Sequence, residues 1–316
     1  MNEKIVLTNW VPESFLVSAP PSVKLVMPER DQVKYTLPEL YEQLSDADAL
    51  LIIRGKCDRE LLDNAPSMKV VGTSSVGFDH IDLKYAVERG VAVVNAPLTV
   101  REGTAEKTVA LMLAIMHRVP QYDIYTREKL HTMDREFGSP CTRAFGKTLG
   151  IVGFGGIGEA VARRAAGLGM RIVYNNSSGA RENSVGGEYL PLNELLRVSD
   201  VVSLHMPLND KTRGMIGARE ISLMKPTAYL VNMARGAVVR EDELVEALKN
   251  GVIAGAALDV FCGEPSVSPK FRELENVVLS PHVGTFDDET RAEMANEALS
   301  GIVGILAGEK VHNRVI

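Results

Sequence analysis

The chain has 316 residues, about two domains at roughly 100–200 residues each, and its 45% hydrophobic and 24% charged residues are typical of a globular protein. Lys and Arg number 35 against 41 Asp and Glu. The resulting net charge of -6, without a basic run, argues against nucleic acid or an anionic membrane as the partner. The 3 cysteines form no CxxC motif and no Cys/His cluster, so we expect neither a disulfide framework nor a metal site. The sequence shows no secretion signal and no run of about 18 apolar residues, so we expect a cytoplasmic protein without a membrane span.

In the first third of the chain, short β-branched runs alternate with segments whose apolar residues have helical spacing. The runs predict strands at residues 4–7, 23–27, 49–53, 69–71 and 91–94. The segments between them predict helices, among them residues 37–44 and 81–89, and Gly90 suits the end of the second. Strands and helices that alternate at this interval predict a parallel sheet covered by helices on both faces.

A long apolar segment, residues 100–119, breaks this alternation. Thr99 and Glu102 have the spacing of a capping box, and Pro120 is expected to end the helix. Because apolar residues surround most of this helix, we predict that it is buried between two bodies. The next segment, residues 125–145, is polar and shows no period.

A second series of strands follows, predicted at residues 148–152, 172–174, 201–204, 229–231, 253–256 and 277–279. Residues 287–306 predict a final helix, which has no sheet of its own and is expected to pack back on the first domain. We therefore predict an α/β fold with two doubly wound parallel-sheet domains. One is discontinuous, residues 1–98 plus 286–316, and the other, residues 99–285, is inserted in it.

A glycine-rich motif, Gly153-Phe154-Gly155-Gly156-Ile157-Gly158, joins a predicted strand to a helical pattern. GxGxxG also occurs in plain glycine turns, but the order of strand, glycines and helix is the one that dinucleotide binding requires. The glycines allow a tight turn and a close approach of the backbone to pyrophosphate, and the helix N-terminus supplies free N–H groups. We predict that the dinucleotide is bound by Gly153, Gly155, Gly156, Ile157 and Gly158.

The acidic residue that usually completes this motif is missing. About 20 residues after the glycines, a carboxylate normally accepts from the adenosine ribose, whereas this chain has Asn176 and Ser177 and no acid before Glu182. Without that carboxylate a 2′-phosphate is not repelled, and Arg181 could supply a positive charge. We therefore favour NADP(H) as the cofactor. The alternative is NAD(H), with neutral polar side chains around an ordinary ribose.

Three single polar residues follow predicted strands, at the edge where an open α/β sheet binds its ligand. Arg235 could hold a carboxylate through two parallel hydrogen bonds and polarise a carbonyl. His282 is a candidate general acid because an imidazole titrates near neutral pH, and Glu264 could orient it. Each residue taken alone also fits an ordinary loop or surface role. Together, behind a dinucleotide motif, they predict carbonyl reduction by hydride and proton transfer.

Seven segments occur in the order of a known family: Gly-Phe-Asp-His-Ile-Asp (77–82), Gly-Thr-Ala-Glu-Lys-Thr-Val-Ala-Leu (103–111), Gly-Lys-Thr-Leu-Gly-Ile-Val-Gly-Phe-Gly-Gly-Ile-Gly (146–158), Asp-Val-Val-Ser-Leu-His-Met-Pro-Leu (200–208), Val-Asn-Met-Ala-Arg-Gly (231–236), Leu-Asp-Val-Phe (258–261) and Ser-Pro-His-Val-Gly (280–284). By these motifs the chain resembles the D-isomer-specific 2-hydroxyacid dehydrogenases over nearly its whole length. The resemblance implies a Rossmann cofactor domain inserted in a discontinuous, flavodoxin-like substrate domain. It also implies a homodimer, whose interface we expect at the helix of residues 100–119 and the segment after it.

The resemblance also implies roles for residues at matching positions. The catalytic trio would be Arg235, Glu264 and His282, in agreement with the analysis above. The backbone of Val76 and Gly77 would hold the substrate carboxylate, with Arg54 nearby. Asp259 would accept from the nicotinamide carboxamide. The other cofactor-lining residues would be Thr108, Asn176, Ser177, Pro207, Thr212, Met233, Ala234 and Gly284, and no metal is implied.

The chain departs from the family pattern at two places that bear on cofactor and substrate. The Arg often found after Asn176 is Ser177, and the tryptophan common within residues 125–145 is absent, since the only Trp is Trp10. We predict a reductase that converts a small 2-ketoacid, of the glyoxylate/hydroxypyruvate type, to a D-2-hydroxyacid. The alternatives are a reductase for a larger 2-ketoacid, such as an aryl pyruvate or a sugar acid, and a non-enzymatic dinucleotide-sensing interaction protein.

Overall fold

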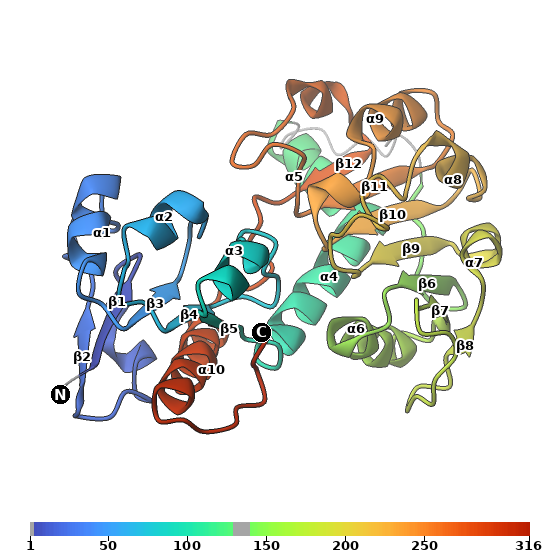
Figure 1. Cartoon of the computed structure of the whole chain (residues 1–316). Helices are drawn as coiled ribbons and strands as arrows, with labels where there is room; N and C mark the ends of the chain where they lie inside the picture. The colour runs from blue at the N-terminus through green and yellow to red at the C-terminus, as the bar shows by residue number, and fades with distance from the viewer. Residues whose placement is uncertain (1–2, 129–139) are drawn as a thin grey trace. The chain divides into compact units, whose positions relative to one another are not determined.

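The chain folds into two compact units, shown in Figure 1, in a computed structural model that describes residues 3–128 and 140–316. Unit 1 consists of Met1–Arg101 and Thr285–Ile316, and unit 2 of Glu102–Gly284. Each unit holds one parallel sheet with helices on both faces. The predicted fold class, α/β with two doubly wound parallel sheets, is therefore confirmed.

Unit 1 is built on a sheet with the strand order β2-β1-β3-β4-β5, which is the flavodoxin-like order. Its elements are β1 Glu3–Leu7, η1 Glu13–Phe15, β2 Val23–Val26, α1 Leu37–Leu44, β3 Ala49–Ile52, α2 Arg59–Asp63, β4 Val70–Thr73, α3 Leu83–Glu88, β5 Ala92–Val94 and α10 Asp288–Leu306. The central strands are fully buried, as expected for a parallel sheet covered on both sides. Helices α1, α2 and α3 contribute to the core on one face, and η1 and α10 to the core on the other.

Helix α10 joins unit 1 although it lies at the other end of the sequence from the strands it covers. The Asp287 carboxylate caps its first turn by accepting from the Thr290 N–H at 2.7 Å. Its buried residues, Ala295, Ala298, Leu299 and Ile302, share a core with β1, β3 and β4. The contact with β4 is tight, because a Cβ at Gly72 would lie 2.6 Å from the Ile302 Cδ1. This glycine therefore sets how closely α10 packs on the sheet.

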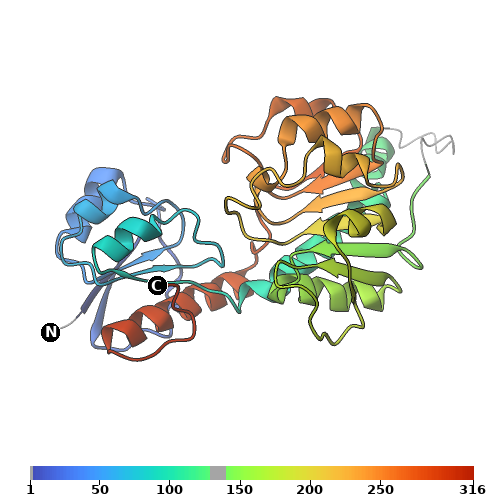
Figure 2. The same ribbon diagram turned by 45° about the vertical axis from the view of Figure 1, so that its right-hand side comes forward.

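Unit 2 contains the larger sheet, with the strand order β12-β11-β10-β9-β6-β7-β8, all parallel. Its elements are α4 Val100–Met116, α5 Val119–Glu128, β6 Thr148–Val152, α6 Gly156–Gly167, β7 Arg171–Asn175, β8 Glu188–Tyr189, α7 Leu192–Val198, β9 Val201–Leu204, α8 Ala218–Ser222, β10 Tyr229–Asn232, η2 Gly236–Val238, α9 Glu241–Lys249, β11 Gly255–Leu258, η3 Pro269–Glu273 and β12 Val277–Leu279. The sheet propagates in both directions from β6, as in a Rossmann fold, and its switch point lies between β6 and β9. Figure 2 shows α4 and α6 below this sheet and α8 and α9 above it.

The prediction of a single helix over residues 100–119 is wrong at its end. Helix α4 stops at Met116, Arg118 adopts a left-handed conformation with φ 53, and α5 begins at Val119. Pro120 lies in the first turn of α5, where the N–H that proline lacks has no partner within the helix, so it starts this helix rather than ending the previous one. The polar segment predicted from residue 125 is helical as far as Glu128, and residues 129–139 of it lie outside the described residues.

The predicted capping box at Thr99 and Glu102 is also wrong. The Glu102 carboxylate pairs instead with Arg163 at 2.8 Å and with Arg164 at 2.6 Å, both on α6. Thr99 donates its N–H and its hydroxyl to Glu297 of α10, at 3.0 and 2.8 Å. The residue that precedes α4 is thus held by a carboxylate from a helix far away in the sequence. Among residues 3–128 and 140–316, none of the helices has the length and apolar content needed to span a bilayer.

Candidate active site

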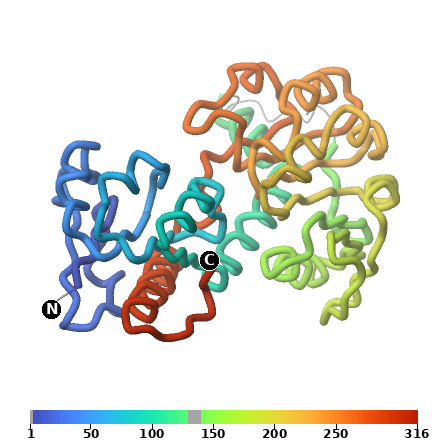
Figure 3. The backbone as a smooth tube through the Cα atoms, viewed as in Figure 1, coloured from blue at the N-terminus to red at the C-terminus, as the bar shows by residue number. Residues whose placement is uncertain are grey.

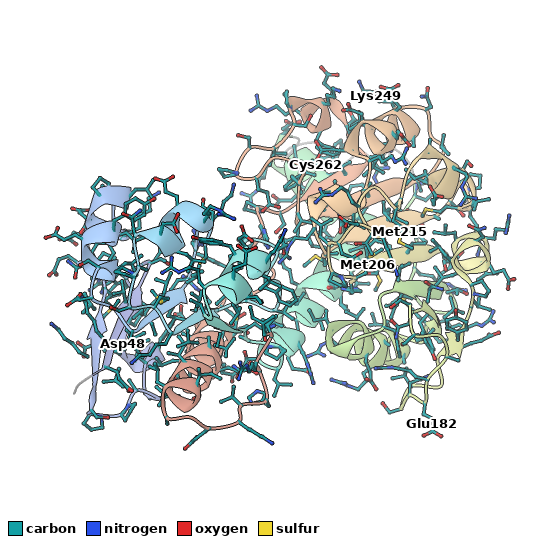
Figure 4. The ribbon with its side chains drawn as sticks, viewed as in Figure 1. Asp48, Glu182, Met206, Met215, Lys249 and Cys262 are labelled. Atoms are coloured by element: carbon teal, nitrogen blue, oxygen red, sulfur yellow. The ribbon has the colours of Figure 1, made fainter. Side chains whose placement is uncertain are left out.

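The glycine-rich turn between β6 and α6 combines two tight approaches with one open position. Gly153 has φ +93, and a Cβ there would lie 2.5 Å from the backbone nitrogen of Met206, which follows β9 and is labelled in Figure 4. A Cβ at Gly158 would lie 2.4 Å from the Gly153 carbonyl oxygen. A Cβ at Gly155, the N-cap of α6, would meet no described atom within 4 Å. The outer glycines therefore bring chain segments together, while the middle one leaves room beside the free N–H groups of the helix.

The segment after β7 carries the predicted ribose-binding residues. Asn176 donates its amide N–H to the Ser178 hydroxyl at 3.0 Å, and Ser177 is exposed. Arg181 lies close to the glycine turn, because its guanidinium carbon is 5.1 Å from the ring centre of Phe154, between the first two glycines. The same guanidinium pairs with Glu159 in the first turn of α6 at 2.7 Å. The segment after β7, where the usual acid is missing, thus carries neutral donors and a cation that lies beside the glycine turn.

The segment after β9 forms a compact turn that contains both Pro207 and Thr212. The Thr212 hydroxyl donates to the Pro207 carbonyl at 2.6 Å, and the Asn209 side-chain oxygen accepts from the Thr212 N–H at 3.2 Å. This turn lies at the switch point, since the His205 N–H at its start donates to the Val152 carbonyl of β6. The structure therefore places these two predicted residues beside the glycine turn.

Arg235, Glu264 and His282 follow β10, β11 and β12, which are adjacent strands in the sheet. The His282 Nδ1 lies 2.6 Å from one Glu264 carboxylate oxygen, and the other oxygen accepts from the Phe261 N–H at 2.9 Å. Partial burial acts to raise the pKa of Glu264. The hydrogen bonds from His282 and Phe261, with the charges of His282 and Arg235, outweigh burial and lower that pKa below its usual value. Glu264 is therefore an anion that fixes the imidazole through Nδ1 and leaves Nε2 for a substrate.

His282 is held in a strained backbone conformation, with φ 54. Asp259 holds it there: its backbone carbonyl accepts from the His282 N–H at 2.7 Å, and its carboxylate accepts from the Val283 N–H at 3.1 Å. Asp259 is 1% exposed, so the predicted nicotinamide-binding residue also anchors the histidine turn. A Cβ at Gly284 would lie 3.2 Å from the second Asp259 oxygen and 3.2 Å from the Met233 methyl, so these three predicted residues adjoin one another.

The turn that carries Arg235 is shaped by Asn232, a buried residue that the sequence analysis did not single out. The Asn232 side chain accepts from the Ala234 N–H and donates to the Arg235 carbonyl, both at 3.1 Å. The arginine donates to the Ala234 carbonyl at 2.9 Å. A Cβ at Gly236 would overlap the Phe261 carbonyl carbon at 2.0 Å, so the Arg235 turn packs directly on the loop that leads to Glu264.

Thr108 lies on α4 and is fully buried. Its hydroxyl donates to the Thr104 carbonyl one turn earlier at 2.7 Å, which leaves the oxygen lone pairs as its contribution to any ligand. A Cβ at Gly284 would lie 3.8 Å from the Thr104 methyl, so this part of α4 adjoins the turn after His282.

Within unit 1, the predicted carboxylate-binding residues follow β4. The Val76 carbonyl accepts from the Asn95 side chain at 2.9 Å, and the Gly77 carbonyl accepts from the Ser75 hydroxyl at 2.6 Å. The N–H groups of Val76 and Gly77 donate to no acceptor among the residues that the structure describes. Arg54 follows β3, the neighbouring strand, and is exposed. A backbone loop can bind an anion when its N–H groups are free and its carbonyl oxygens are held elsewhere. The Val76 and Gly77 peptide groups meet both conditions.

His205 directly follows β9 and is a half-buried residue to which the sequence assigned no role. Its Nε2 lies 2.7 Å from the Ser203 hydroxyl, and its Nδ1 is buried without a partner among the described residues. Burial lowers the pKa of His205 to about 3, from 6.5 in an unfolded chain. The imidazole is therefore neutral in the folded protein wherever the pH exceeds about 3.

This burial predicts a pH dependence of stability that a His205→Gln variant lacks. Between about pH 6.5 and pH 3 the unfolded chain binds a proton at His205 that the folded chain does not, so the free energy of unfolding falls as the pH falls. In urea titrations at pH 7, 6, 5 and 4, the wild type should lose up to about 1.4 kcal/mol more per pH unit than the variant. If the free energy of unfolding depends on pH in the same way in both proteins, a neutral imidazole at His205 is contradicted.

Comparison with known proteins agrees with this geometry. Residues 109–284 match the family model described as D-isomer specific 2-hydroxyacid dehydrogenase, NAD binding domain. A glyoxylate reductase of Thermococcus litoralis is 38% identical over 100% of this chain and 97% of its own length. A glyoxylate reductase of Korarchaeum cryptofilum is 40% identical over 100% of this chain and 96% of its own length.

Solved structures give the same result for the whole chain. The crystal structure of a glyoxylate reductase from Paecilomyes thermophila superposes with a TM-score of 0.85 at 32% identity, covering 99% of this chain and 98% of that one. The NADPH-dependent glyoxylate/hydroxypyruvate reductase of Sinorhizobium meliloti, in complex with NADP and malonate, superposes with a TM-score of 0.86 at 29% identity, covering 100% and 97% of the two chains. The protein therefore belongs to the D-isomer-specific 2-hydroxyacid dehydrogenase family, whose members are dinucleotide-dependent oxidoreductases.

Proposed function

We propose that this protein reduces a small 2-ketoacid, of the glyoxylate/hydroxypyruvate type, to the D-2-hydroxyacid with NADPH. The observation that carries the proposal is the 2.6 Å pair of His282 and Glu264, next to the Arg235 turn at the carboxyl edge of a Rossmann sheet. The printed activities of the relatives in Thermococcus litoralis and Sinorhizobium meliloti support the same substrate class.

The proposed mechanism assigns one task to each residue. When bound, NADPH supplies a hydride for the carbonyl carbon of the substrate. His282 delivers the proton from Nε2 to the carbonyl oxygen, so that hydride and proton together give the hydroxyl group. Glu264 holds Nδ1 and stabilises the charged imidazole before the transfer. Arg235 donates to the carbonyl oxygen and the adjacent carboxylate. The N–H groups of Val76 and Gly77, in unit 1, are the proposed donors to a substrate carboxylate.

The residues around the glycine turn fit a dinucleotide. Open space at Gly155 beside the N-terminus of α6 suits the pyrophosphate. The nicotinamide end would be lined by Thr108, Met233, Ala234, Asp259 and Gly284, and the adenosine end by Asn176, Ser177, Pro207 and Thr212. We assign residues 99–285 to cofactor binding and residues 1–98 plus 286–316 to substrate binding.

Chiral analysis of the product tests the proposed reaction. Hydroxypyruvate incubated with the protein and NADPH should yield D-glycerate and one NADP⁺ per molecule reduced. The L isomer, or oxidation of NADPH without formation of glycerate, would contradict the proposal.

We propose NADP(H) as the preferred cofactor because of the charges after β7. A 2′-phosphate near Asn176 would meet neutral donors and the Arg181 guanidinium, which is held near the site by Glu159. The Arg181–Glu159 pair is partly exposed, so its attraction is modest, and a dianionic phosphate can compete for the guanidinium. Without Arg181, the Glu159 carboxylate would instead repel the phosphate.

Two substitutions should therefore change 2′-phosphate binding in opposite directions. Arg181→Ala should weaken binding of adenosine 2′,5′-bisphosphate about 10–100-fold, since a hydrogen bond between charged groups is lost. Glu159→Gln should tighten it, because it frees the guanidinium and removes a like charge. Isothermal titration with this fragment and with 5′-AMP measures both effects without turnover. Arg197→Ala, a change at an exposed arginine on α7, is the control, and equal losses for the two fragments in Arg181→Ala would contradict the assignment.

We also propose a cytoplasmic homodimer that forms through α4 and α5. The expected interface extends into the segment after them, of which residues 129–139 lie outside the described residues. Val119 and Ile124 on α5 are 55% and 56% exposed, and no residue of this helix is buried, so α5 offers apolar surface to a partner. Cys57, Cys141 and Cys262 are unpaired thiols, which agrees with a reducing compartment. A monomer in sedimentation equilibrium at micromolar concentration would contradict the dimer.

A further inference from the structure

The segment that follows α10 returns to the edge strand β5, as the tube in Figure 3 shows. Arg314 forms an antiparallel bridge with Val94, and the Val315 N–H donates to the Val93 carbonyl at 2.8 Å. The side chains of Val315 and Ile316 pack against the core formed with α1, α2 and α3. This segment is thus a fixed part of unit 1.

Asn313 connects this segment to the residue after β5 through two hydrogen bonds. Its backbone carbonyl accepts from the Asn95 N–H at 3.1 Å, and its side-chain N–H donates to the Asn95 carbonyl at 2.7 Å. The same side chain donates to the Glu297 carbonyl of α10 at 3.0 Å. Asn313 is 2% exposed and sits against Gly301, where a Cβ would lie 2.6 Å from its amide atoms. The backbone of Asn95 is therefore clamped on both sides by one buried asparagine.

Asn95 passes this restraint to the loop after β4. Its side chain donates to the Val76 carbonyl at 2.9 Å, and the next residue, Ala96, donates its N–H to the Ser75 carbonyl at 2.9 Å. Ser75 in turn holds the Gly77 carbonyl. Both carbonyls of the loop are occupied in this way, while the N–H groups of Val76 and Gly77 keep no acceptor among the described residues.

We propose that Asn313 is a positioning residue for substrate binding: by clamping Asn95, it keeps the Val76 carbonyl engaged and the two N–H groups available to a carboxylate. This inference rests on the proposed role of Val76 and Gly77 in holding the ketoacid. Preorganised donors bind an anion without the entropic cost of ordering a loop. The substrate carboxylate does not react. The binding free energy that it gains from these N–H groups is therefore the same in the bound substrate and in the transition state.

The test is a separation of KM from kcat with glyoxylate and NADPH as the probes. Asn313→Ala and Asn95→Ala should each raise KM about 10-fold, with kcat and the NADPH dissociation constant unchanged within about 2-fold, as expected when uniform binding is lost. Asn95→Ala/Asn313→Ala should have no higher KM than Asn95→Ala alone, because Asn313 acts through Asn95. Gly301→Ala, which displaces Asn313 by a methyl group, should raise KM in the same way without removing a polar group.

Arg314→Ala is the matched control, since it changes an exposed side chain one residue away and should keep the wild-type KM. A wild-type KM in folded Asn313→Ala and Gly301→Ala proteins would overturn the inference, as would equal losses in kcat and in NADPH binding. If the wild type itself fails to reduce glyoxylate or hydroxypyruvate, the proposed function fails instead. The two failures are therefore distinguishable.

Discussion

His282→Ala is expected to lower kcat for ketoacid reduction by about 10²–10⁴-fold, which is the range that general acid catalysis contributes. The imidazole is positioned for this task because Glu264 holds Nδ1 at 2.6 Å and Asp259 holds the backbone through the His282 N–H. Removing the imidazole leaves the carbonyl oxygen without its proton donor. Hydride transfer would then have to generate an alkoxide, which only unoriented solvent water could protonate. Stopped-flow measurement of NADPH oxidation with saturating hydroxypyruvate measures the loss directly.

The backbone at this position calls for a second variant. His282 has φ 54, a conformation that alanine tolerates poorly and asparagine tolerates well. We expect His282→Asn to lose as much activity as His282→Ala. Because asparagine tolerates the backbone conformation, His282→Asn should unfold at a higher urea concentration than His282→Ala. The NADPH dissociation constant should stay close to the wild-type value in both. Turnover near the wild-type rate in a folded His282→Asn protein would remove histidine from the mechanism.

Arg235→Lys is expected to lower kcat/KM by about 10²–10³-fold, comparable to the loss of one donor to a developing oxyanion. The guanidinium offers two parallel N–H groups in a fixed plane, and the Arg235 turn is shaped by Asn232 at two hydrogen bonds of 3.1 Å. Lysine keeps the positive charge but supplies a single rotating ammonium, so it cannot bind carbonyl and carboxylate oxygens in one plane. The positive charge of lysine should therefore preserve little of the activity in Arg235→Lys.

Two readouts separate this role from a structural one. Addition of guanidinium to an Arg235→Ala protein should restore part of the rate, because the small cation can occupy the vacated position, and it should have no effect on His282→Asn. The dissociation constant of oxalate from the NADPH complex should rise in Arg235→Lys, since oxalate presents the same carboxylate oxygens as the substrate. An Arg235→Lys protein with wild-type affinity for oxalate and an unchanged kcat/KM would contradict the assignment.

Most strands could be predicted from the sequence because buried parallel strands are often continuous β-branched runs. The two-residue strand β8 was not predicted, and β11, which has no β-branched residue, lies at Gly255–Leu258 rather than at the predicted residues 253–256. The boundaries of β6, β9 and β12 agree with the predicted ranges. Helices α2 and α8 have five residues each, too few for a hydrophobic period to appear, and they were not predicted. Helix α5 was missed because a proline can either end a helix or stand in its first turn, and local sequence does not distinguish the two.

In the candidate site, too, positions that depend on the local order of elements could be predicted, whereas contacts between distant segments could not. The trio and the glycine turn follow strands, so their position at the sheet edge could be inferred from the order of elements. The supporting residues Asn232 and Asn313 could not, because an asparagine gives no sign in the sequence of which distant carbonyl it will bind. Glu297 illustrates the point, since it binds Thr99, just before α4, from a position 198 residues later in the chain.

The most direct test of the proposed activity is a grid of initial rates with the purified protein, which crosses NADPH and NADH with glyoxylate, hydroxypyruvate, pyruvate and phenylpyruvate. We expect fast oxidation of NADPH with glyoxylate or hydroxypyruvate, slower rates with NADH, and the slowest rates with phenylpyruvate. Rates with NADH that exceed those with NADPH would retain the mechanism and contradict the role given to Asn176 and Arg181. An absence of turnover with all eight pairs, in a protein that binds NADPH, would contradict the proposed reduction of a small 2-ketoacid.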